Sequence, residues 1–127
     1  SEFDTMAKAT TNFFFDTNTT PDAFADFYDN AAVPAGWNGP YITRSSDSHP
    51  KFGTYTVGRA TYDPAAVETL SGGDDFWLQL TNVPCEVVKK VDVQVDGAED
   101  NVAGSVNYAT CADGSNGNII YLLARDI

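Results

Sequence analysis

The chain has 127 residues, of which 43% are hydrophobic and 13% aromatic, values typical of one folded domain and not of a disordered chain. Its net charge is −11, and Lys89-Lys90 is the only adjacent basic pair, so we predict no binding to nucleic acid or to anionic membrane surfaces. The chain contains no apolar run near the roughly eighteen residues that cross a bilayer, and no charged-then-apolar signal peptide opens it.

Residues 4–33 are predicted to be helical, in two segments. The first segment is Asp4–Phe15, whose apolar residues recur on one side at helical spacing: Met6, Ala9 and Phe13. Its threonines and its run of three phenylalanines lower the helix propensity. Asp16–Thr20 is rich in asparagine and threonine and predicts a break after this segment.

A second helix is predicted over Pro21–Ala32. Thr20 can cap this helix, Pro21 suits its first position, and Asp22 lies at the positive end of its dipole. Four residues fall on one amphipathic face: Phe24, Phe27, Tyr28 and Ala31. We expect Val33-Pro34 to end the helix.

Residues 34–50 are predicted to form a loop that connects the helical part to a sheet. Within this loop, Gly36 and Gly39 allow a positive φ, and Pro40 fixes its own φ. Trp37 and Tyr41 are large apolar rings with polar tips that can attach the loop to a core. We therefore predict that these five residues form a structural corner and do not bind a ligand.

Residues 51–127 are predicted to form a sheet with a late pair of cysteines. Four segments either alternate apolar and polar residues or are rich in residue types that favour strands. They predict the strands Lys51–Asp63, Asp75–Val83, Ser105–Cys111 and Asn118–Arg125. In the second strand, Phe76 and Leu78 face one way and Trp77 faces the other, which predicts a half-buried strand. Pro84–Val91 favours a short helix.

These elements predict a single α+β domain over residues 1–127. An N-terminal helix is expected to pack on an antiparallel sheet of about four strands. The crossover helices between successive strands that a parallel sheet requires are missing from the pattern. The opening triplet Ser1-Glu2-Phe3 is compatible with a cloning remnant.

The sequence offers little basis for catalysis. His49 is the only histidine, and it precedes Pro50 in a polar loop, where we interpret it as an exposed bystander. The chain has no G-x-S-x-G, H-E-x-x-H or P-loop signature. We therefore predict that the protein is not an enzyme and has no catalytic residues, metal site or cofactor.

Three oxygen-rich segments leave one alternative open. They are Asp74-Asp75, the group Asp96, Glu99 and Asp100, and the group Asp113, Asn116 and Asn118. Calcium takes carboxylate, amide and backbone oxygens, but none of these segments has the EF-hand spacing. We interpret them as solvated turns, and the alternative function is a secreted calcium-binding or ligand-binding module.

Cys85 and Cys111 leave one intramolecular pairing. A cytosolic protein would keep two such thiols reduced and buried, whereas an oxidising compartment would join them. Their spacing is too long for a CxxC redox pair or half of a CxxC zinc site. We favour the oxidising compartment.

Two stretches of the chain resemble the type IV pilin-like family. Pro34-Ala35-Gly36-Trp37-Asn38-Gly39-Pro40-Tyr41-Ile42 is similar to the P-x-x-W-x-G-P-Y-[IL] segment of major pseudopilins of type II secretion. Asn82-Val83-Pro84-Cys85, leading to Asn107-Tyr108-Ala109-Thr110-Cys111, is similar to the C-terminal region of type IV pilins that a disulfide closes. The resemblance implies a Cys85–Cys111 bond that encloses the final strands.

The resemblance also implies a function. It predicts the extracytoplasmic part of a structural subunit that assembles into a pilus or secretion filament, anchored in the inner membrane before assembly. The apolar N-terminal half-helix of that family, which mediates membrane anchoring and self-association, is absent from the printed residues, so we expect it upstream. The D-P-W-G-x-P stretch of major pseudopilins is also missing. The chain thus combines features of the pilin and pseudopilin branches.

Overall fold

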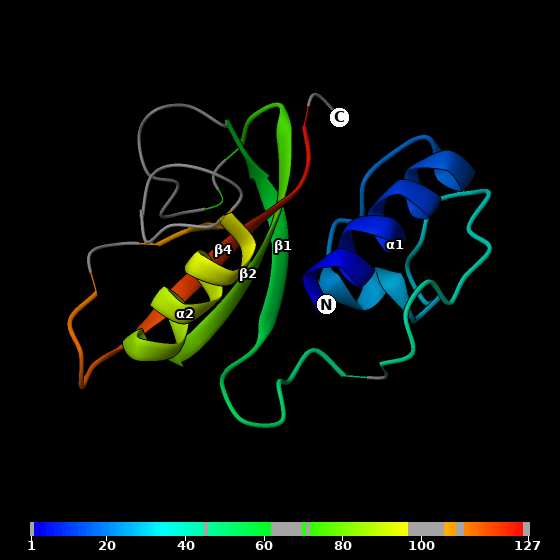
Figure 1. Cartoon of the computed structure of the whole chain (residues 1–127). Coiled ribbons are helices and arrows are strands. Elements are labelled where there is room, and N and C mark those ends of the chain that lie inside the picture. Colours follow the sequence, from blue (N-terminus) through cyan, green and yellow to red (C-terminus); the bar gives the residue numbers. More distant parts are fainter. Residues whose placement is uncertain are drawn as a thin grey trace.

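The computed structural model describes residues 2–44, 46–61, 70, 72–96, 106–108 and 111–125. Over these residues an N-terminal helix, a short 3-10 turn and a second helix accompany one antiparallel sheet. In Figure 1 the strands run between helix α1 on the right and helix α2 on the left. The predicted α+β class is therefore confirmed.

Helix α1 (Glu2–Thr17) confirms the first predicted helical segment. Met6, Ala9 and Phe13 are buried, as their spacing predicts. The threonines are accommodated because Thr10 donates its hydroxyl hydrogen to the carbonyl one turn earlier, at 2.9 Å. The helix ends at the predicted break, where Asn18 adopts a left-handed conformation with a φ of 59°.

The predicted second helix over Pro21–Ala32 is wrong, because only the 3-10 turn η1 (Phe24–Phe27) forms there. The carboxylate of Asp26 accepts hydrogen bonds from the N–H groups of the two residues that precede η1, at 3.1 and 3.4 Å. Asp29 accepts a hydrogen bond from the N–H of Ala31 at 3.0 Å. Asp26 thereby caps the start of η1, whereas Asp29 competes with a helical hydrogen bond for the N–H of Ala31. Residues 4–33 are therefore helical only in part.

The sheet has three strands of six or more residues and one very short strand. Strand β1 (Tyr55–Ala60) pairs with β2 (Asp75–Pro84), and β2 pairs with β4 (Asn116–Ala124). Strand β3 (Val106–Asn107) has two residues and pairs with β4 at the edge. All pairings are antiparallel, in the order β1-β2-β4-β3. About four strands were predicted, and part of the predicted strand Ser105–Cys111 lies outside the described residues.

The main core is shared by α1, the sheet and α2. Phe13 of α1, Leu78 of β2 and Ile119 of β4 are buried in it. Phe3 stacks on Tyr121 of β4, with ring centroids 4.6 Å apart. Phe3, part of the opening triplet, therefore takes part in the packing of α1 on the sheet.

Trp77 differs from the half-buried strand that the alternation in β2 predicts. Its side chain is fully buried in a second, smaller cluster with Ala60 and Ile120. The indole N–H donates a hydrogen bond to the carbonyl of Ala60 at 2.9 Å, which satisfies its polar tip. Strand β2 is thus covered on both faces at this point.

Helix α2 (Cys85–Asp96) follows β2 without a gap and extends the predicted short helix by more than one turn. Val88 is fully buried, and Val87 and Val91 pack partly against the main core. This valine stripe explains why the segment is helical although valines favour strands. None of the helices in the described part of the chain is both long and apolar enough to span a membrane.

Candidate functional site

The predicted corner residues lie together and pack against the C-terminal end of α1. The indole N–H of Trp37 donates a hydrogen bond to the carbonyl of Asp26 at 2.7 Å. The backbone N–H of Tyr41 donates to the carbonyl of Phe27, also at 2.7 Å. Trp37 and Tyr41 meet edge to face, with ring centroids 5.7 Å apart. The indole of Trp37 and the backbone of Tyr41 therefore attach the corner to η1 on the two sides of the Gly39-Pro40 step.

Tyr41 also connects the corner to α1. Its hydroxyl donates a hydrogen bond to the carboxylate of Asp16 at 2.7 Å and accepts one from the N–H of Asn38 at 2.8 Å. Its ring lies edge-on to Phe13, with centroids 5.5 Å apart. Burial raises the pKa of Tyr41 above its ordinary value; the N–H of Asn38 lowers this pKa, and the hydrogen bond and charge of Asp16 raise it.

The two corner glycines are needed for different reasons. Gly36 has a φ of 93°, and a Cβ there would lie 2.3 Å from the carbonyl oxygen of Asp16. Gly39 does not use a positive φ; a Cβ there would lie 2.6 Å from the ring of Trp37. The peptide bond between Gly39 and Pro40 is cis. Position 36 therefore requires a glycine because of its positive φ, and position 39 requires one because the aromatic rings pack closely against it.

An open hollow of about 490 Å³ lies beside the corner. Its lining combines two aromatic rings with polar and acidic groups: Tyr28, Asp29, Asn30, Trp37, Gly39 and Pro40. Burial raises the pKa of Tyr28, and the negative charges of Asp47 and Asp29 raise it further. The sequence pattern assigned Tyr28 to a helix face and did not place Asp29 or Asn30 in any site. Only the fold brings η1 and the corner together here.

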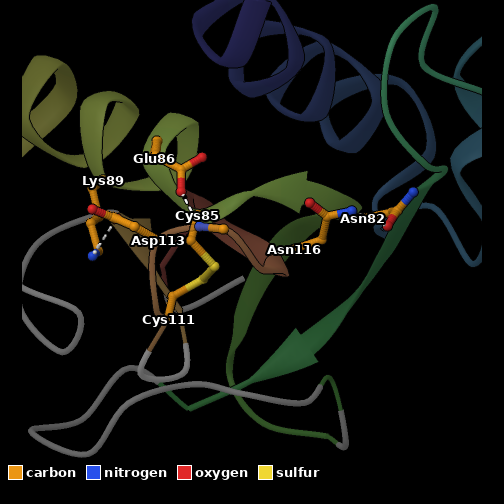
Figure 2. The surroundings of a disulfide bond; sticks show 8 residues. Asn82, Cys85, Glu86, Lys89, Cys111, Asp113 and Asn116 are labelled. Atoms are coloured by element: carbon orange, nitrogen blue, oxygen red, sulfur yellow. Dashed lines mark hydrogen bonds and ion pairs between the residues drawn. A yellow bond between two sulfur atoms is a disulfide. The ribbon is translucent and has the colours of Figure 1, made fainter.

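Cys85 and Cys111 form a disulfide bond, as the sequence predicts (Figure 2). Their Cα atoms lie 5.5 Å apart, and 26 residues separate them in the sequence. Cys85 is the first residue of α2, directly after β2, and Cys111 precedes the turn into β4. The bond therefore joins the start of α2 to the approach to β4.

The turn between Cys111 and β4 is fixed to the first turn of α2 (Figure 2). Glu86 accepts a hydrogen bond from the backbone N–H of Gly114, and Lys89 forms an ion pair with Asp113 at 3.1 Å. The carbonyl of Ser115 accepts a hydrogen bond from the N–H of Cys85 at 2.9 Å. These bonds and the disulfide connect the turn before β4 to the start of α2.

The amides of Asn82 and Asn116 extend this region toward the sheet. Asn116 donates its side-chain N–H to the side-chain oxygen of Asn82 at 2.9 Å (Figure 2). Asn82 has a φ of 57° and lies in a β-bulge, where the register between β2 and β4 shifts after Leu80. The bulge lies near the end of β2, just before α2 begins at Cys85.

Three of the described side chains in the oxygen-rich segments are paired with other side chains or buried. Asp113 is paired with Lys89, Asn116 with Asn82, and Asp75 is buried in β2. Among the described residues, no three His, Cys, Asp or Glu side chains gather in a way that would hold a metal ion. Glu99 and Asp100 lie outside the described residues, and the side chain of Asp96 is not described.

His49 has a structural role that the interpretation as an exposed bystander missed. Its Nδ1 accepts hydrogen bonds from the N–H groups of Lys51 and Phe52, at 3.0 and 3.3 Å. Its ring stacks on Phe52, with centroids 4.6 Å apart. The imidazole therefore caps the tight turn that precedes β1.

Comparison of the chain with protein-family models, with curated proteins and with solved structures gave no match in any of the three.

Proposed function

We propose that the chain is the extracytoplasmic domain of a type IV pilin-like subunit, a structural protein without catalytic activity. Such a subunit assembles with copies of itself into a pilus or secretion filament. A segment upstream of the printed residues would mediate membrane anchoring and self-association, and the assembly machinery of the filament would be its other partner.

The support that carries most weight is the order of elements around the disulfide. An N-terminal helix packs on an antiparallel sheet, and the Cys85–Cys111 bond joins the start of α2, directly after β2, to the approach to β4. This is the order that the resemblance of the two quoted stretches implies. The corner residues of the first stretch also lie together, against the end of α1.

The disulfide further supports a place outside the cytoplasm. Such bonds persist in oxidising compartments, such as the periplasm and the cell surface, and are rare in the cytosol. The net charge of −11 is compatible with an exposed, soluble surface. We therefore place the domain in the periplasm before assembly and in an extracellular filament after it.

Deletion of the encoding gene from its native host tests the proposal. Antibodies against this domain should label filaments along their length in electron micrographs of wild-type cells, and the deletion strain should lack the labelled filaments. Complementation with the wild-type gene should restore them, whereas the double variant Cys85→Ser/Cys111→Ser should restore fewer. Unlabelled filaments that persist unchanged in the deletion strain, together with unchanged protein secretion, would contradict the proposal.

A further inference from the structure

We propose that the hollow beside the corner binds a basic side chain, preferentially arginine, of a protein partner, which departs from the sequence-based prediction that the corner residues bind no ligand. The hollow lies between the residues that directly follow η1 and the corner, and it is lined in part by the rings of Tyr28 and Trp37 and the carboxylate of Asp29. In Figure 1 the segment that follows η1, drawn in cyan to teal, runs around α1 on the side away from the strands.

The two aromatic walls are held in place before any ligand arrives. The indole N–H of Trp37 is already bonded to the carbonyl of Asp26, so the ring presents an apolar surface to the hollow. Tyr28 packs edge-on to Phe24, with ring centroids 6.0 Å apart. Fixed walls reduce the entropy that binding costs, because neither ring has to be ordered by the ligand.

The electrostatic environment of the hollow favours a cation. Asp29 contributes a carboxylate to the lining, and Asp47 lies close enough for its charge to act on the phenol of Tyr28. None of the described residues that line the hollow is basic. Aromatic rings attract cations through their negative faces, and the negative potential around the rings adds to this attraction. An anionic ligand would be repelled.

An arginine side chain fits this combination better than a simple ammonium ion does. Its guanidinium group is planar, so it can stack on an indole or phenol ring and bond to a carboxylate at the same time. The amide of Asn30 and the backbone of the Gly39-Pro40 step add polar groups around the hollow. These groups can bond to the main chain on either side of an arginine residue, which favours a peptide over a free cation.

The binding experiment uses NMR titration of the folded protein with Nα-acetyl-arginine N-methylamide. The chain has two tryptophans, so two indole N–H signals are expected, and the fully buried Trp77 is an internal reference. The chemical shift of the Trp37 signal should change as ligand is added and should saturate at millimolar ligand concentrations. The Trp77 signal should not move. The citrulline analogue, which has the same shape without the charge, should give no saturable shift at the same ionic strength. Methylguanidinium should bind more weakly than the blocked residue.

Two variants distinguish the effect of the Asp29 carboxylate on binding from the effect of the protein's net charge. Asp29→Asn removes the charge but keeps an oxygen for the N–H of Ala31, and it should weaken binding by about two- to fivefold. Asp22→Asn makes the same change in net charge at an exposed residue outside the lining, and it should leave the affinity unchanged. The inference fails if the arginine derivative gives no saturable shift, if citrulline or methylguanidinium binds equally well, or if both variants weaken binding equally. None of these results depends on filament assembly.

Discussion

The hydroxyl of Tyr41 donates a hydrogen bond of 2.7 Å to the carboxylate of Asp16, which joins the corner to the last turn of α1 across 25 residues of sequence. The same hydroxyl accepts a hydrogen bond from the N–H of Asn38. One phenol oxygen therefore fixes the helix end and the corner to each other. The contribution of this contact to the free energy of unfolding can be measured directly.

Tyr41→Phe should lower the free energy of unfolding by about 1–2 kcal/mol, because a hydrogen bond to a charged acceptor is lost and the N–H of Asn38 loses its acceptor. Asp16→Asn should cost less, since an amide oxygen can still accept the bond. Urea denaturation of both single variants and the double variant gives their coupling energy. Strictly additive effects would show that the two side chains do not interact.

The raised pKa of Tyr41 predicts how this stabilisation depends on pH. Because the phenol ionises at higher pH in the folded state than in the unfolded state, its contribution is fully present below the ordinary pKa of 10.0 and is lost as pH rises through the folded-state pKa. The difference in unfolding free energy between wild type and Tyr41→Phe should therefore be larger at pH 8 than at pH 11. A constant difference over this range would show that the phenol is not perturbed.

Removing the Cys85–Cys111 bond should destabilise the domain by roughly 3–4 kcal/mol, the loop-closure entropy expected for the 26 residues that separate the cysteines. The double variant Cys85→Ser/Cys111→Ser, compared with the wild type by urea denaturation, measures this cost. Intact mass before and after reduction should differ by two hydrogen atoms. Two freely alkylated thiols in the unreduced native protein would contradict the bond.

Gly117 of β4 should tolerate no side chain, because a Cβ there would lie 2.9 Å from the Sγ of Cys111. Gly117→Ala should cost about 1–3 kcal/mol, as crowding of a packed site does. Gly114→Ala is the matched control: it adds the same methyl group where no atom lies within 4 Å, although at a φ of 88°. Its smaller cost of about 1 kcal/mol should come from the backbone alone. Thermal or urea unfolding distinguishes the two.

The sequence predicts those parts of the fold that depend on periodic burial. The spacing of Met6, Ala9 and Phe13 identified the buried face of α1, and the valine stripe identified α2. The periodicity failed after η1. Phe24 and Phe27 are buried as a helix face would be, but Asp29 accepts the N–H of Ala31 and the N–H of Tyr41 bonds to the carbonyl of Phe27, the two groups that a continued helix would join. Periodicity alone does not reveal this competition.

The candidate site was predictable only in part, for a related reason. Turn chemistry and ring size identified the corner residues, including Trp37 and Tyr41, within one continuous stretch of sequence. The hollow depends on tertiary contact between that stretch and η1, so nothing local marks Asp29 or Asn30 as lining residues. The structural role of His49 likewise depends on the turn that its own imidazole caps.

The last prediction concerns the surface of α1 and assembly. Phe15 projects from α1 with 87% of its area exposed, the most exposed of the large hydrophobic side chains in the described residues. One exposed phenylalanine is a small apolar area, and the net charge of −11 opposes self-association, so this chain should be monomeric at moderate salt. Light scattering coupled to size-exclusion chromatography checks the mass over a range of concentrations.

In the native protein we expect an apolar segment of about twenty residues upstream of α1, enough to span a bilayer and to bring α1 helices together in a filament. Phe15→Ser should then leave the isolated chain monomeric and folded, because the side chain is exposed, yet reduce filament assembly in the native host. Val93→Ser, a change at an exposed residue of α2 with 46% of its area accessible, is the matched control and should assemble normally. Equal assembly of both variants would argue against α1 contacts between subunits, and a native gene that encodes no apolar extension would argue against the filament itself.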